Sequence, residues 1–109
     1  MKMYTTPEQT AKLIELGFAR PRIAAPKLKW VDGEPTFEPQ YTIGELLSFL
    51  PENIAKENEM PSTLNISLLN GEWCVEYADF LGADFSFHSV EVIDAIFDMV
   101  TILKEKGVI

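Results

Sequence analysis

The chain has 109 residues, of which 47% are hydrophobic and 24% charged, and its formal net charge at neutral pH is −8. This length predicts a single domain over residues 1–109, and the apolar content argues against a wholly disordered chain. The acidity disfavours binding to nucleic acid. The absence of a long apolar run or an apolar leader predicts a cytoplasmic protein with no membrane partner.

The charge is unevenly distributed along the chain. Residues 1–30 carry six Lys or Arg and two Glu, whereas residues 31–109 carry three Lys and fifteen Asp or Glu. This asymmetry favours a basic front segment that lies against acidic elements of the same fold or of a second copy. A dedicated binding site in the basic segment Arg20–Lys29 stays open as the alternative.

Two short helices carry clear start signals and are predicted over about residues 7–16 and 43–50. Each is preceded by a capping threonine whose capping-box partner stands three residues on: Thr6 with Gln9, and Thr42 with Glu45. Pro7 suits the first helical position, and Pro51 stops the second helix.

The segments that follow these helices are less regular. Four prolines between residues 18 and 41 exclude a long helix there. The Asp32-Gly33 pair is typical of a two-residue hairpin turn and predicts an edge ribbon over about residues 28–37. Residues 51–62 are expected to form an acidic loop with one helical turn around Ile54.

The strongest local pattern is a central β-hairpin over about residues 63–69 and 72–78. Two alternating runs meet at Asn70-Gly71, a pair typical of a type I′ turn. The other side of this hairpin is mixed in polarity and is expected to face solvent. One side carries six apolar side chains that we expect in the core: Leu64, Ile66, Leu68, Trp73, Val75 and Tyr77.

A long amphipathic helix is predicted over about residues 90–106, with Ser89 as its cap and Gly107 at its end. A two-stranded hairpin alone is marginally stable, so this helix must cover it. The predicted fold class is therefore α+β, a small antiparallel sheet packed by helices. The apolar stripe of the helix supplies the rest of the expected core: Ile93, Ile96, Val100 and Leu103.

The only cysteine and the only histidine, Cys74 and His88, raise the question of a nucleophile and its base. The hairpin register places no base beside Cys74, and the nearby carboxylates of Glu72 and Glu76 disfavour a thiolate. The sequence does not fix the side on which His88 lies. We therefore expect Cys74 to be a small, semi-buried side chain, and we predict no catalytic residue.

Metal and cofactor sites are not predicted either. One Cys and one His are too few for a structural zinc site, and the acidic clusters lack the spacing of a calcium loop. Asp94 and Asp98 stand one helical turn apart, which is more typical of a solvated face than of a cation site. Phosphate-loop and dinucleotide motifs are missing, so we expect neither a cofactor nor an enzyme.

Two features indicate a contact surface. Phe80, Phe85 and Phe87 fall in a predicted loop, which cannot bury three aromatic rings within itself. They either cover the end of the hairpin or stand exposed for a partner chain, often an identical one. The acidic face of the last helix adds three residues to this candidate interaction surface: Glu91, Asp94 and Asp98.

Three stretches together resemble a group of small uncharacterised proteins of gut anaerobes and their prophages or other mobile elements. They are "YTIGELLSFLP" at 41–51, the W-x-V-x-Y of 73–77 and "EVIDAIFDMVTILKEKGVI" at 91–109, about a third of the chain. The resemblance implies an intracellular accessory protein with a small sheet packed by helices. No activity, cofactor or functional residue comes with the group.

The sequence leaves three functions open. The first is a small non-enzymatic interaction module that self-associates or binds another protein, through the last helix or the Phe80–Phe87 segment. The second is an acidic phage-type inhibitor that imitates the charge of nucleic acid and binds a basic host protein. The third, ranked last, is a small enzyme that depends on the carboxylates of the last helix or on His88.

Overall fold

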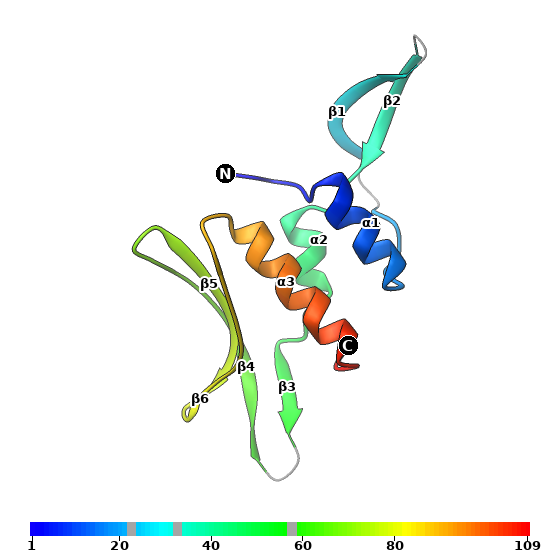
Figure 1. Cartoon of the computed structure of the whole chain (residues 1–109). Coiled ribbons are helices and arrows are strands. Elements are labelled where there is room, and N and C mark those ends of the chain that lie inside the picture. The colour runs from blue at the N-terminus through cyan, green and yellow to red at the C-terminus, as the bar shows by residue number, and fades with distance from the viewer. Residues whose placement is uncertain (22–23, 32–33, 57–58) are drawn as a thin grey trace.

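The computed structural model describes residues 1–21, 24–31, 34–56 and 59–109, and the side chains of residues 1–21, 40–55 and 60–109. The N-terminus leads into α1, and the chain ends just after α3 (Figure 1). Its helices and strands follow in chain order: α1 (Pro7–Glu15), β1 (Ala24–Val31), β2 (Glu34–Pro39), α2 (Ile43–Ser48), β3 (Asn53–Lys56), β4 (Glu59–Leu69), β5 (Glu72–Asp79), β6 (Gly82–Ser89) and α3 (Val92–Glu105).

Strands β3 to β6 form one antiparallel sheet in the order β3-β4-β5-β6, so each strand lies beside its neighbour in the chain. The helices lie on one side of this sheet, with α3 nearest to β5 and β6 (Figure 1). The predicted α+β class, a small antiparallel sheet packed by helices, is therefore confirmed.

Two of the four strands differ from the sequence-based prediction. The acidic loop with a helical turn around Ile54 is wrong, because Asn53–Lys56 is β3 and pairs with β4. The loop over residues 80–87 is also wrong, because Gly82–Ser89 is β6 and pairs with β5. Each of these strands lies at an edge of the sheet, where pairing with a neighbour decides the structure more than local propensity does.

The central hairpin has the predicted register. Leu64 pairs with Tyr77, Ile66 with Val75, and Leu68 with Trp73, which places all six on one side of the sheet. Asn70 and Gly71 both have positive φ, 54° and 77°, as a type I′ turn requires.

The ribbon predicted over about residues 28–37 is formed by β1 and β2, with Leu28 opposite Phe37 and Trp30 opposite Pro35. Its predicted turn, Asp32-Gly33, lies outside the described residues. The ribbon forms a separate two-stranded sheet rather than an edge of the main one, and it extends away from the helices (Figure 1). The Cα radius of gyration is accordingly 15.8 Å, larger than the roughly 13 Å of a compact domain of this length.

The capping boxes of α1 and α2 are both formed as predicted. The predicted start of the last helix is wrong: it begins at Val92 with Glu91 at the cap position, and Glu91 makes no side-chain capping hydrogen bond. The physical reason is that β6 continues through Ser89, whose hydroxyl instead accepts a hydrogen bond from the Glu91 backbone N–H, 3.2 Å away.

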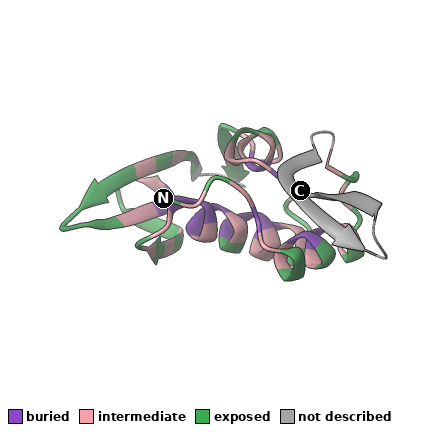
Figure 2. Ribbon diagram, turned by 90° about the horizontal axis from the view of Figure 1, so that it is seen from above, coloured by how far each residue is buried: buried purple, intermediate pink, exposed green. Residues whose placement is uncertain are grey.

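The core lies among the three helices and between α3 and the inner face of the sheet, and its buried residues gather on the helices (Figure 2). Of the expected core, the fully buried residues are Val75, Tyr77, Ile93, Ile96, Val100 and Leu103. Three more, Leu64, Ile66 and Trp73, are half-buried and pack against them. The placement of Leu68 in the core is wrong, because it is 55% exposed. It stands at the tip of the β4–β5 hairpin, beyond the contacts between α3 and the sheet.

Candidate functional site

The outer face of the sheet, which turns away from α3, brings together the side chains that could take part in a reaction. Cys74 on β5 lies opposite His88 on β6, with Ser86 beside them on the same face. The Cys74 Sγ is 3.8 Å from His88 Nε2 and 3.6 Å from Ser86 Oγ, and Ser86 Oγ is 3.1 Å from His88 Nε2. Glu76 completes the cluster, since its Oε2 accepts from the Cys74 thiol at 3.8 Å.

The expectation that no base stands beside Cys74 is therefore wrong. That expectation considers only the two strands of the central hairpin. In the structure β6 is a third strand beside β5, and it places His88 next to Cys74. The alternation of Phe85 and Phe87 with Ser86 and His88 is a strand pattern that could have predicted this neighbour. Cys74 is half-buried, as expected, and His88 is exposed.

Acyl transfer needs more groups than this cluster supplies. An imidazole can accept a proton from a thiol, but an acyl-transfer site also needs donors for a developing oxyanion. The backbone of β5 lies between two neighbours in the sheet, which engage its N–H groups. In the part of the chain that the structure describes, no group of three or more His, Cys, Asp or Glu side chains could hold a metal ion.

The free edge of β6 can be derived from one hydrogen bond. The Leu64 N–H donates to the Glu52 carbonyl at 2.9 Å, so the backbone groups of Leu64 face away from β5. Hydrogen-bonded and non-hydrogen-bonded pairs alternate in an antiparallel ladder. Tyr77, the partner of Leu64, therefore turns its backbone groups toward β6, and so does Val75.

The same alternation continues across β6. Phe85 and Phe87, which face Tyr77 and Val75, turn their backbone groups toward β5. Ser86 and His88 consequently turn their N–H and C=O groups to the outer edge of the sheet. Among the described residues, no backbone hydrogen bond reaches either of them from outside the sheet. This edge is not among the predicted features, because the sequence predicts a loop rather than a strand over residues 80–87.

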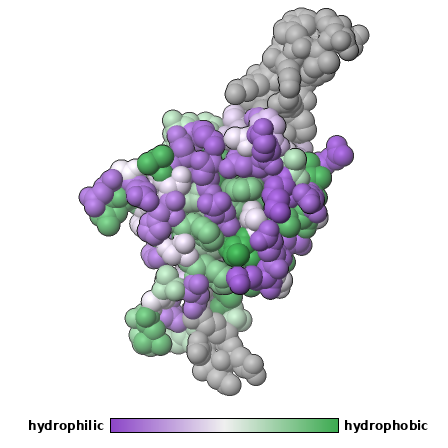
Figure 3. All heavy atoms as spheres, in the orientation of Figure 1, coloured by the Kyte–Doolittle hydropathy of each residue, from purple (hydrophilic) through white to green (hydrophobic). Residues whose placement is uncertain are grey.

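Hydrophobic side chains gather at the lower end of the sheet, where β5 turns into β6 (Figure 3). Phe80 and Leu81 form this turn and are 77% and 82% exposed. Met60 of β4, which is 61% exposed, lies at the same end of the sheet, because the antiparallel register pairs Thr63 with Ala78. These three residues are the apolar tip.

The three aromatic residues of the expected contact surface are thus divided. Phe80 is exposed, which agrees with the alternative that these aromatic residues stand exposed for a partner chain. Phe85 and Phe87 are half-buried and pack against the core, so their place in an exposed loop is wrong. Their side chains point to the inner face because they alternate with Ser86 and His88 along β6.

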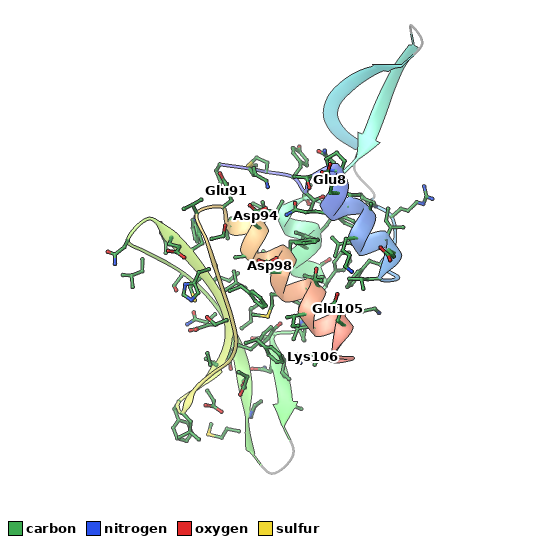
Figure 4. The ribbon with its side chains drawn as sticks, viewed as in Figure 1. Glu8, Glu91, Asp94, Asp98, Glu105 and Lys106 are labelled. Carbon is green, nitrogen blue, oxygen red and sulfur yellow. The ribbon has the colours of Figure 1, made fainter. Side chains whose placement is uncertain are left out.

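Glu91, just before α3, and Asp94 and Glu105 on α3 have partners in the N-terminal part of the chain (Figure 4). The Lys2 backbone N–H donates to Glu91 Oε2, and Lys2 Nζ lies 2.7 Å from Asp94 Oδ1. Lys12 on α1 forms a second ion pair with Glu105, at 3.5 Å. The attraction expected between the basic front and acidic elements of the same fold is thus observed for these two lysines. Arg20 is exposed, and the side chains of residues 22–29 lie outside the described part of the chain.

Asp94 and Asp98, one turn apart on α3, have opposite pKa shifts. Burial raises the pKa of the Asp94 carboxyl, but hydrogen bonds from Lys2 and Gln9 and the charge of Lys2 outweigh it, so the net pKa is lowered. Partial desolvation of its carboxyl, together with the neighbouring charge of Asp94, raises the pKa of Asp98. Asp98 remains exposed at the surface (Figure 4).

The chain matches no protein-family model, no curated protein and no solved structure. Among the described residues, the structure contains no helix with the length and apolar character needed to cross a membrane.

Proposed function

We propose that this chain is a small cytoplasmic protein-interaction module that binds an extended segment of a protein partner along the outer edge of β6. The proposal rests on one observation: the backbone N–H and C=O groups of Ser86 and His88 face the outer edge of the sheet. An unpaired strand edge is a template for pairing with another chain, and peptide-binding proteins use it by strand addition.

Two further properties of β6 support this role. The stretch Phe85–Ser89 carries no formally charged residue, although the whole chain carries −8. Edge strands that avoid pairing are commonly protected by charged side chains, proline, short length or bulges. In β6 the charge of Asp84 and the register shift lie before Phe85, and the stretch Phe85–Ser89 contains no lysine, proline or register shift. The apolar tip at one end of β6 offers an anchor for the partner's side chains.

The acidic-inhibitor function has weaker support in the described residues. Glu91 and Asp94, two of the three carboxylates expected to form its binding face, bind Lys2. A contact that imitates nucleic acid needs carboxylates that are free to meet a basic partner. Asp98 remains exposed, but one carboxylate offers little charge for such a contact.

An enzymatic function gains one observation, the proximity of Cys74 to His88. It predicts that Cys74→Ser abolishes activity while binding along β6 persists. The interaction module predicts that Cys74→Ser leaves partner binding intact.

A matched pair of variants at one position tests the proposed module. Ser86→Pro removes the outward N–H without removing a bond to β5, whereas Ser86→Ala keeps that N–H. Both tagged variants and the wild type would be used to capture partners from lysate, with washes at low and high salt. We expect the wild type and Ser86→Ala to retain the same partner at both salt concentrations, and Ser86→Pro to lose it. Equal capture by all three proteins would refute binding along this edge.

A further inference from the structure

The outer edge of β6 is self-complementary, which means that it can pair with the same edge of a second copy. The two residues with outward backbone groups, Ser86 and His88, are separated by one residue, Phe87. A two-fold axis through Phe87 would place Ser86 of one copy opposite His88 of the other, and the reverse. Each such pair would exchange two backbone hydrogen bonds, as hydrogen-bonded antiparallel pairs do.

We infer that a second copy of this chain binds along β6, so that two four-stranded sheets join into one continuous antiparallel sheet. This inference deepens the proposed function and rests on it, because it assigns the partner of the same edge. Two-fold pairing is the most frequent symmetry of soluble oligomers, and it requires a surface that complements itself.

The side chains on the outer face favour this pairing. Within one chain, Ser86 Oγ lies 3.1 Å from His88 Nε2, so the hydroxyl and the imidazole already suit each other as hydrogen-bond partners. In the joined sheet each His88 gains a second serine on the adjacent strand, because directly opposed residues share a face. No like charges meet in this register, since Phe85–Ser89 carries none.

The inner face favours the same register. Phe87 is only half-buried, although it packs against the core. With the axis at Phe87, the two phenylalanines form a non-hydrogen-bonded pair, the arrangement that brings opposed side chains closest together. Each ring would then cover surface that the other leaves open at the edge of a single sheet.

Neighbouring registers are less favourable. Pairing Ser86 with Ser86 would set His88 against Asp84, where the β5–β6 ladder shifts register. Pairing His88 with His88 would set Ser86 against Val90, which lies beyond the end of β6. The register centred on Phe87 pairs Ser86 of each copy with His88 of the other copy.

Sedimentation velocity of the full chain tests this inference, from micromolar to submillimolar concentration. We expect the wild type to reach the mass of two chains. Ser86→Ala keeps the N–H and loses only the hydroxyl beside His88, so it should still dimerise, at a somewhat higher concentration. Ser86→Pro removes one N–H donor from each copy, and the loss of two hydrogen bonds should weaken association about 30-fold. Added salt should strengthen the dimer, because it screens the repulsion between two acidic chains.

Three outcomes would overturn the inference: a wild type that stays monomeric, a Ser86→Pro variant that dimerises as well as the wild type, or association that salt weakens. The third would indicate contact between the basic front of one copy and the acidic surface of another. Circular dichroism would establish that Ser86→Pro is folded. If it is not, exchange of the Ser86 and His88 amides in the wild type decides, because dimerisation must slow both as concentration rises.

The two proposals fail separately. A monomeric wild type whose captured partner is lost in Ser86→Pro but kept in Ser86→Ala would refute the dimer and leave the interaction module standing. A dimer that Ser86→Pro does not weaken would refute the pairing of two copies along β6, and the capture experiment would still decide whether another protein binds that edge.

Discussion

The two faces of β5 carry alternate residues of one strand but have opposite surroundings. Val75 and Tyr77 point to the inner face and are fully buried, whereas Cys74 and Glu76 point to the outer face, where α3 does not reach. The inner face therefore supplies the stability of the sheet, and the outer face and the β6 edge are available for binding. Stability and binding should consequently respond to different substitutions within the same few residues.

The largest effect is expected on the inner face. Tyr77→Ala should lower the free energy of unfolding by about 3–5 kcal/mol, because it empties a fully buried position. It also removes the hydroxyl that donates to the Pro51 carbonyl at 2.6 Å. Urea denaturation followed by circular dichroism would measure the change.

Tyr77→Phe is the matched control, since it keeps the ring and removes only this hydroxyl. It should lower the free energy of unfolding by about 1–2 kcal/mol. Burial raises the pKa of Tyr77 to about 12. Wild-type stability should therefore decline as the pH rises from the ordinary tyrosine value of 10.0 through that pKa, and less so in Tyr77→Phe. If Tyr77→Ala were as stable as the wild type, the assignment of the inner face as the core would be wrong.

A smaller effect, of opposite sign at two neighbouring positions, is expected on α3. Asp94→Asn removes the ion pair with Lys2 and should lower the free energy of unfolding by about 0.5–1 kcal/mol at neutral pH. Asp98→Asn removes a carboxylate whose charge is disfavoured by burial and by Asp94, so it should leave stability unchanged or raise it slightly. Thermal melts at pH 7 would compare the two variants.

The pH dependence follows from the same two carboxyls. The folded-state pKa of Asp94 lies below the ordinary 3.8, so its contribution to stability is present above that value and is lost as the pH falls through the lowered pKa. The folded-state pKa of Asp98 is raised above 3.8, so protonation of this carboxyl increases the free energy of unfolding as the pH falls toward 3.8. Equal responses of Asp94→Asn and Asp98→Asn would contradict the pairing of Lys2 with Asp94.

The smallest effect is expected on the outer face. Cys74→Ser should change the free energy of unfolding by no more than about 0.5 kcal/mol, because the side chain lies outside the core. Partner capture and dimerisation should also be unchanged, since neither uses the thiol. A loss of either with a normal unfolding curve would show that the Cys74 thiol takes part in binding.

The parts of the fold that sequence could predict are those with strong local signals. Asn70-Gly71 determines the turn of the central hairpin, and the threonine capping boxes determine where α1 and α2 begin. The apolar stripe of α3 predicts its buried face because the helical repeat brings those residues to one side. Leu68 shows the limit of such patterns: alternation predicts its side of the sheet, but not that the tip of the hairpin extends beyond α3.

The candidate site was harder to predict because it depends on pairing between strands. Cys74 and His88 become neighbours only when β6 lies beside β5, and the residues that bring this about are Phe85 and Phe87, which pack against the core. The free edge at Ser86 and His88 depends further on which residues of β4 turn toward β5. That property follows from the geometry of the whole sheet rather than from any local pattern.

Amide hydrogen exchange along β6 is the most direct test of the central claim, that its outer edge is open in one copy and filled by a partner. At low protein concentration we expect the Phe85 and Phe87 amides to exchange slowly and the Ser86 and His88 amides to exchange fast. Raising the concentration, or adding the captured partner, should slow the second pair alone. If all four amides are equally protected at every dilution, the edge is already covered within the single chain, and the account of β6 as a binding strand is wrong.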